Sequence, residues 1–357
     1  MYAPGSSRSL PPLLPYRFTF LAVLLVAQLS SFTGHASGSQ GWGIVVDPKG
    51  AVSFTDLPSE TVWKILPGSR EKIAIDKHTR SLVLGADGKL YGSEPAPEAA
   101  VWAIDRDGSL SYVVPPSTNL PMDLQAFTLD AKGAIYSTSA GSGTVVLQRR
   151  GPGGRIETVA GGGRGHADGK GSAAKFQGID GMAWGPDGRL YVTDGPYVRT
   201  VTADGTVETL GGGAMTKTEG DEDLLGLAVA QDGTVYAADF GQRRVIVIPP
   251  GGRARTLMRT GRFWSPAGVA TAGGDLYLLE HLGGPLAFAA DLEVGPYARV
   301  RRLSPAGAGG NPAVLTTLWG GNTIAGAGVL AILLLVGFFL LRRKRRDRFG
   351  AGRRLRL

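Results

Sequence analysis

The stretch from Asp180 to Gly212, DGMAWGPDGRLYVTDGPYVRTVTADGTVETLGG, constrains the fold most. It alternates short β-prone runs with turn residues and predicts four strands in about thirty residues. Asp-Gly between such runs is a strong hairpin signal, because glycine readily adopts the positive φ that these turns require. The expected strands are Met182–Gly185, Leu190–Thr193, Val198–Thr202 and Val207–Leu210.

Related units recur along the chain. Each has a glycine ending a hairpin turn, in five of the six a tyrosine three residues later, and in five an acid six residues later. Intervals of 38 to 55 residues between these glycines leave room for four short strands per unit. The anchoring glycines are Gly50, Gly88, Gly133, Gly188, Gly233 and Gly274.

Six four-stranded units without intervening helices predict an all-β protein, a six-bladed β-propeller. Each unit buries little alone and gains its core by stacking on its neighbours. The units begin and end in the same strand phase, so we expect whole blades to meet where the ring closes. An exchanged strand from residues 37 to 46, or a linear solenoid, is the alternative.

The segments Gly163–Asp194 and Leu224–Ile248 resemble NHL repeats, with Gln242 where that family usually has Asn. The resemblance extends over roughly residues 42 to 318 and implies a six-bladed propeller. It does not imply a chemistry, because such propellers serve as binding platforms, lactonases and lyases.

The net charge of +8 does not belong to the repeats. Residues 342 to 356 hold nine Lys or Arg and one acid, so this tail accounts for the whole charge and residues 1 to 341 sum to zero. A nucleic-acid-binding body is therefore disfavoured. The chain has no cysteine, which excludes disulfides and thiolate metal sites.

The N-terminus has the pattern of a secretory signal peptide. Arg8 and Arg17 precede an apolar run from Phe18 to Ala27, and small residues near Ala36 favour cleavage there. We expect residues 1–36 to be removed; an uncleaved anchor is the alternative.

The C-terminus predicts one transmembrane helix. Thr323 to Leu341 is a run of nineteen uncharged residues, enough to cross the ~30 Å hydrocarbon core. By the positive-inside rule the basic cluster that follows stays cytoplasmic, which places the propeller outside. A processed sorting signal is the alternative. The expected parts are the propeller 37–318, the membrane helix 319–341 and the tail 342–357, with Trp319, Arg342, Arg343, Lys344, Arg345 and Arg346 at the membrane interface.

The acids that end the second strands are predicted to be structural. Asp56, Glu94, Asp194, Asp239 and Glu280 recur at one place in the unit, before turns where carboxylates accept local backbone N–H bonds. A ring of carboxylates around a cation is the alternative. The glycine-rich loop from Gly161 to Gly171 lacks the features of a phosphate loop and is expected to be a long connector between blades.

Asp180 departs from the repeat, because it stands directly before an inner strand. Asp180-Gly181-Met182 resembles the motif in which gluconolactonase-like propellers use an Asp for metal binding and chemistry. The rest of that set is missing: Gln40-Gly41-Trp42 stands where an acid is expected. His78, His166 and His281 do not occupy the positions that amidating-lyase propellers use for histidine.

We therefore expect a membrane-anchored, extracytoplasmic module that binds a protein or small-molecule ligand and needs no cofactor. The alternative is a lactonase-like hydrolase that uses Ca²⁺ or another divalent cation at Asp180. The contact surface is predicted to be one propeller face, and its candidate residues are Asp180, Phe263, Trp264, Glu280 and His281.

Overall fold

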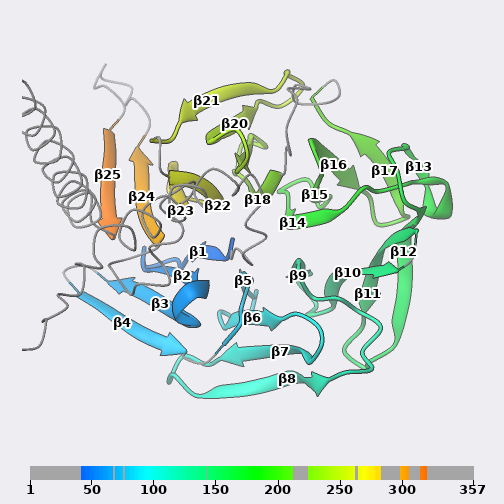
Figure 1. Cartoon of the computed structure of the whole chain (residues 1–357), viewed down its shortest axis with the longest axis horizontal. Helices are drawn as coiled ribbons and strands as arrows, with labels where there is room; N and C mark the ends of the chain where they lie inside the picture. The colour runs from blue at the N-terminus through cyan, green and yellow to red at the C-terminus, as the bar shows by residue number, and fades with distance from the viewer. Residues whose placement is uncertain are drawn as a thin grey trace, which may run out of the picture. The chain divides into compact units, whose positions relative to one another are not determined.

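The computed structural model describes residues 42–319, apart from 67–68, 75–76, 142, 212–223, 262–263, 283–297 and 305–313. The chain divides into two compact units, Met1–Gly38 and Ser39–Leu357. All the described residues belong to the second unit, which holds the β-sheets seen in Figure 1. The described helices are two single 3₁₀ turns, η1 (Leu57–Ser59) and η2 (Gly171–Ala173).

The first three sheets each use four consecutive strands. Blade 1 contains β1 (Ile44–Val46), β2 (Val52–Asp56), β3 (Thr61–Leu66) and β4 (Ser69–Ala74). Blade 2 contains β5 (Ser81–Leu84), β6 (Leu90–Glu94), β7 (Ala99–Ile104) and β8 (Leu110–Ser117). Blade 3 contains β9 (Phe127–Leu129), β10 (Ile135–Gly141), β11 (Thr144–Arg150) and β12 (Ile156–Gly163).

The second half of the ring follows the same plan. Blade 4 contains β14 (Ile179–Trp184), β15 (Leu190–Asp194), β16 (Tyr197–Val201) and β17 (Thr206–Thr209), with β13 (Gly169–Lys170) added outside β17. Blade 5 contains β18 (Leu224–Val229), β19 (Val235–Asp239), β20 (Arg244–Ile248) and β21 (Arg255–Arg259). Blade 6 contains β22 (Trp264–Ala272), β23 (Asp275–Leu282), β24 (Ala298–Ser304) and β25 (Val314–Trp319).

The six sheets close into a ring, which confirms the predicted six-bladed propeller. Each inner strand contacts the next in the order β1, β5, β9, β14, β18 and β22, and β22 contacts β1 again (Figure 1). Blade 1 takes all four of its strands from residues 44–74 and blade 6 from residues 264–319. Whole blades therefore meet at the closure, as expected, and a linear solenoid is excluded.

Apolar residues fill every interface between neighbouring blades. Val62 and Ala74 of blade 1 pack on Leu82 and Trp102 of blade 2, and five comparable clusters separate the other pairs. The cluster at the closure joins Phe54 to blade 6 residues such as Leu279 and Val300. Since each sheet buries both faces, its stability depends on two neighbours at once.

Glycines let the inner strands approach each other closely. A Cβ on Gly268 of blade 6 would lie 2.2 Å from the carbonyl oxygen of Trp42 in blade 1. A Cβ on Gly181 of blade 4 would lie 2.3 Å from the carbonyl oxygen of Leu225 in blade 5. Real Cβ atoms do not come this near to backbone oxygen, so a side chain here would force the inner strands apart.

The long segment before blade 4 is more than the connector that the sequence predicted. Its residues 169–170 pair with β17 as a fifth strand, and Ala174 and Phe176 enter the core between blades 3 and 4. The physical reason is Arg199 of β16, whose guanidinium donates to the carbonyl oxygens of Ala167 and Lys175 and fixes this segment against the blade.

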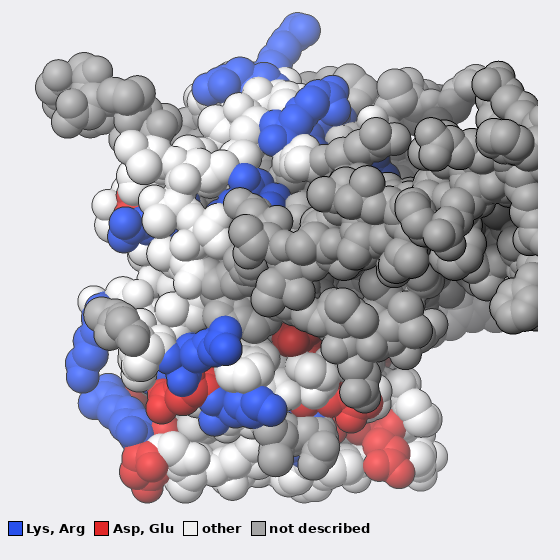
Figure 2. Space-filling view, turned by 60° about the vertical axis from the view of Figure 1, so that its left-hand side comes forward, with Lys and Arg blue, Asp and Glu red and all other residues white. Residues whose placement is uncertain are grey.

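The outermost strand of blade 1 presents charged side chains to solvent. In β4, Ser69 to Lys72 are exposed, whereas Ala74 is buried. Figure 2 shows one side of the molecule, where Lys and Arg occur together with Asp and Glu over the lower part of the described surface. This distribution agrees with a propeller body whose charges largely balance.

We predict that Gly268→Ala destabilises the propeller by about 2–3 kcal/mol, because the added methyl meets a backbone oxygen across the closing interface. The matched control is Gly163→Ala, at an exposed position where an added Cβ meets nothing within 4 Å. Urea unfolding followed by circular dichroism measures both. Equal stability of the two variants would contradict the idea that close backbone approach controls ring closure.

Candidate functional site

The mouth of the central channel is formed where the six inner strands begin. Gly43, Gly181, Gly226 and Gly268 lie at one level, because each is in close contact with the inner strand of the next blade. The residue before each of these positions, and before Ser81 and Ala126 in blades 2 and 3, therefore belongs to the mouth. In blade order these residues are Trp42, Arg80, Gln125, Asp180, Leu225 and Ala267.

Half of the mouth is apolar. Trp42, Leu225 and Ala267, from the neighbouring blades 1, 5 and 6, form one buried cluster together with Phe240. The cluster fills this side of the mouth with closely packed apolar side chains. The indole N–H of Trp42 is buried there without a hydrogen-bond acceptor among the described residues.

The other half, from blades 2 to 4, is polar and partly exposed. The Arg80 guanidinium donates to the Gln125 side-chain oxygen over 3.1 Å. Asp123 lies beside them, and burial raises the pKa of its carboxyl despite its hydrogen bond to Gln125 and the nearby Arg80. Leu124, between Asp123 and Gln125, has a φ of +59°, a left-handed conformation that is strained for leucine. Desolvated charge and backbone strain at one place are typical of functional sites.

Asp180 begins the bulged part of β14 and is half-buried. The ladder with β15 shifts register between Ile179 and Met182, which turns the Asp180-Gly181 pair out of the regular pleat. The Gly181 N–H donates to the hydroxyl of Thr193, which in turn donates to the Leu225 carbonyl of blade 5. These bonds hold the backbone of Asp180 at the blade 4–blade 5 contact.

Asp180 is the single carboxylate among the six mouth residues, all of which are described. Within the described residues no group of three or more His, Asp or Glu is arranged to hold a metal ion. The mouth instead combines one carboxylate, one guanidinium and one amide. Such groups recognise a ligand by charge-assisted hydrogen bonds.

In blades 4, 5 and 6 the acid at the end of the second strand is held by an arginine of the third strand. In blades 1 and 2 the partners differ: Asp56 accepts from the Ser59 hydroxyl, and Glu94 pairs with Lys77 at 3.1 Å. Asp194 and Arg199 are both fully buried and meet at 2.7 Å, and Asp194 also accepts the N–H groups of Gln177 and Gly178. In blade 5, Asp239 accepts from Arg244 at 2.6 Å. These carboxylates are already satisfied, which gives them the structural role that the sequence suggested together with an arginine partner that it did not.

The remaining ligand candidates fall into this buried network. Glu280 has no exposed side-chain surface and accepts hydrogen bonds from both Arg299 and Arg301. His281 is buried. The guanidinium carbon of Arg299 lies over the indole ring of Trp264, 4.4 Å from the ring centroid. All three belong to blade 6 and are buried, whereas Asp180 is half-buried at the start of β14 in blade 4. Phe263 lies outside the described residues.

The predicted membrane-interface residues lie at the end of the chain. Trp319 is the last residue of β25, where its backbone pairs with Val300, so blade 6 extends one residue beyond the predicted boundary. Within the described part of the chain, no helix is long and apolar enough to span a bilayer. The predicted signal peptide, the span Thr323–Leu341 and the cluster from Arg342 to Arg346 lie outside the described residues.

Sequence reasoning singled out Asp180 but not Arg80 and Gln125, which stand at the equivalent position in blades 2 and 3. The sequence did contain a signal for these two residues. Arg80 and Gln125 stand at the same distance before their hairpin turns as Asp180 does before its own. The acid–arginine pairs also had a signal: in blades 4 and 5 the arginine follows the acid by five residues. In blade 6 a longer insertion conceals this spacing.

No protein-family model and no curated protein matches the chain. Several solved structures match the chain. A streptogramin B lyase is 14% identical in sequence with a TM-score of 0.51, and the match covers 80% of this chain and 85% of the lyase chain. A gluconolactonase from Xanthomonas campestris is 17% identical at 0.51, covering 69% and 85%. Regucalcin, a calcium-binding protein from Agrobacterium tumefaciens, is 17% identical at 0.52, covering 71% and 86%. Such identities show the fold alone, that of gluconolactonase-like and related propellers.

We predict that Arg199→Met costs about 3–5 kcal/mol, because it leaves the Asp194 carboxylate buried without its cation. Arg189→Met is the matched control: its ion pair with Asp187 is about half exposed, and we expect a change of about 0–1 kcal/mol. Urea unfolding at pH 7 measures both. A loss below about 1 kcal/mol for Arg199→Met would contradict a structural role for these pairs.

Proposed function

We propose that this chain is a membrane-anchored, extracytoplasmic β-propeller that binds a small zwitterionic molecule at the mouth of its central channel. The observation that supports this most is the division of the mouth into a polar and an apolar half. Arg80 and Asp180 supply opposite charges on blades 2 and 4, and Gln125 on blade 3 supplies an amide between them.

A zwitterion the size of an amino acid matches these groups. Its carboxylate suits the planar guanidinium of Arg80, which can donate two parallel hydrogen bonds. Its ammonium suits the carboxylate of Asp180. An apolar side chain would then lie toward the wall formed by Trp42 and Leu225. Apolar side chains combined with a few placed polar groups are typical of small-molecule sites.

The residues at the mouth positions around Asp180 favour a binding role over hydrolysis. A Ca²⁺ site needs several converging oxygen ligands. The neighbouring mouth positions hold Gln125 and Leu225, and the next position on the polar side holds the cation Arg80. A guanidinium close to the site opposes a second cation there.

We expect one or more amino acids, each with an apolar side chain, to bind the purified full-length chain in isothermal titration calorimetry. Asp180→Asn and Arg80→Gln should each weaken binding at least tenfold, because each removes one charge-assisted contact. The control is Asp232→Asn in the exposed turn of blade 5, which should leave binding unchanged.

Two results would overturn this function. One is that no free amino acid binds, and the other is that binding persists unchanged in Asp180→Asn. Hydrolysis of a lactone that needs added Ca²⁺ and is lost in Asp180→Asn would establish the lactonase-like alternative instead.

Membrane anchorage rests on the sequence of the C-terminal segment. We expect the full-length chain to sediment with membranes and a chain ending at Gly321 to stay in the soluble fraction after export, because the apolar run is then missing. Protease added outside intact cells should degrade the propeller and spare a tag placed after Leu357. A protected propeller or an exposed tag would contradict the proposed orientation.

A further inference from the structure

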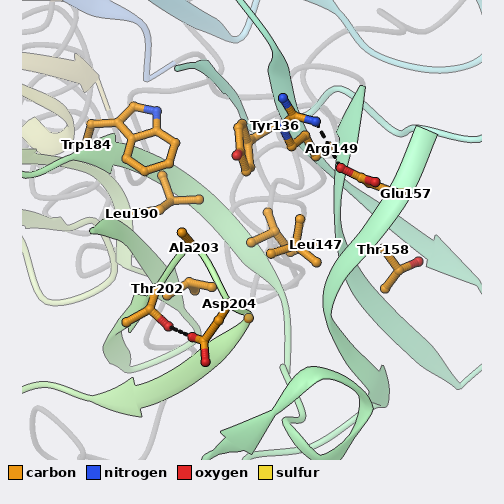
Figure 3. A pocket seen from close by; sticks show the side chains of 13 residues that line it. Tyr136, Leu147, Arg149, Glu157, Thr158, Trp184, Leu190, Thr202, Ala203 and Asp204 are labelled. Atoms are coloured by element: carbon orange, nitrogen blue, oxygen red, sulfur yellow. Dashed lines mark hydrogen bonds and ion pairs between the residues drawn. The ribbon is translucent and has the colours of Figure 1, made fainter. Parts of the chain in front are cut away.

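A second cavity lies between blades 3 and 4, away from the channel mouth. Its volume is about 240 Å³, and Figure 3 shows aromatic and aliphatic side chains around it with charged groups beside them. Trp184 lines it from the end of β14, whereas Asp180 stands near the start of that strand. The two residues are four residue steps apart along the strand, which is about 13 Å. The lining also includes Tyr136, Leu147, Arg149, Glu157 and Asp204.

Tyr136 enters this cavity because its hairpin turn departs from the repeat. In blades 2 and 4 the recurring tyrosine packs over a glycine and donates to the turn aspartate, as Tyr191 does to Asp187 at 3.0 Å. In blade 3, Asp130 replaces the glycine and Lys132 replaces the aspartate. Tyr136 instead meets Trp184 of blade 4 edge to face, with ring centroids 5.2 Å apart.

Trp184 is the second departure from the repeat. The equivalent residues are smaller, for example Leu84 and Leu129 in blades 2 and 3, which pair in the same register. The indole N–H of Trp184 is buried without a hydrogen-bond acceptor among the described residues, a cost that a leucine would not carry. The Trp184 ring packs against the core between blades 3 and 4, so the cost falls on the indole N–H alone.

The charges around the cavity balance. Arg149 donates to Glu157 at 2.9 Å, and both side chains are partly exposed. On the opposite wall Asp204 is paired with Lys170 at 2.8 Å and accepts from Thr202, and these partners lower its pKa so that it is an ionised acceptor. The rim therefore offers strong donors and acceptors without an excess of either charge.

From these features we infer that the cavity binds a single neutral sugar ring of hexose size. The volume lies below the range of pockets for drug-sized ligands, which suits one ring. The faces of Tyr136 and Trp184 attract the weakly positive C–H edges of a pyranose. The carboxylates of Glu157 and Asp204 accept hydroxyl protons, and the paired charges favour a neutral ligand over an ionic one.

The test is a saturation-transfer-difference NMR titration of the full-length chain, kept in a detergent without a sugar headgroup. The probes are glucose, galactose, mannose and N-acetylglucosamine, with indole as a non-sugar ring. We expect at least one sugar to bind with a dissociation constant on the order of 1 mM, since so small a ligand makes few contacts.

Two variants address the cavity by different routes. Trp184→Leu restores the residue of blades 2 and 3, and Ala203→Leu fills the space from the turn that lines it. Each should weaken sugar binding at least tenfold. Tyr91→Phe, at the equivalent of Tyr136 in blade 2, is the matched control and should leave it unchanged, as should Asp180→Asn at the channel mouth.

Absence of saturable binding by any of the four sugars overturns the inference. Sugar binding that persists in both Trp184→Leu and Ala203→Leu also overturns it, because the sugar then binds elsewhere. So does binding of indole without any sugar, which would mark the cavity as a site for apolar rings. Sugar binding lost in Asp180→Asn alone would place the sugar at the channel mouth instead.

Discussion

The structure depends on how closely the inner strands can approach each other around the channel. A four-stranded sheet has two faces to bury, and a ring of six gives every sheet two neighbours. At Gly181, Gly226 and Gly268 the backbones of adjacent blades touch with no room for a Cβ. These contacts fix the level of the mouth, and so they decide which side chains meet there.

The stability of the ring and the chemistry of its face use different residues. Asp194, Asp239 and Glu280 are the most evident acids of the repeat, yet each is held by an arginine of its own blade. Breaking such a pair leaves an uncompensated buried charge, so these carboxylates serve to stabilise the fold. The ligand binding that we propose for this face therefore uses positions where the blades differ, which are the starts of the inner strands.

The repeat itself was predictable from the sequence, because hairpin turns and alternating strands are local signals. The strands around Tyr191 lie within a residue or two of their expected bounds at most ends. Long-range contacts were not predictable. Nothing local shows that Arg199 binds the segment around Ala167, or that Trp42 packs on Leu225 from the far end of the chain. Asp180 was singled out because it breaks the repeat, but the equivalent positions of Arg80 and Gln125 become evident only when the blades are aligned.

Residues that depart from the repeat indicate function most strongly where the departure lowers the stability of the blade. Leu124 holds a left-handed conformation, Asp123 carries a desolvated carboxyl, and Trp184 buries an N–H that has no acceptor among the described residues. Each lowers the stability of a blade that a regular repeat residue would not strain. The first two lie at the channel mouth and the third at the cavity between blades 3 and 4. The two sites that we propose therefore follow from one physical criterion, and blade 4 contributes to both through the opposite ends of β14.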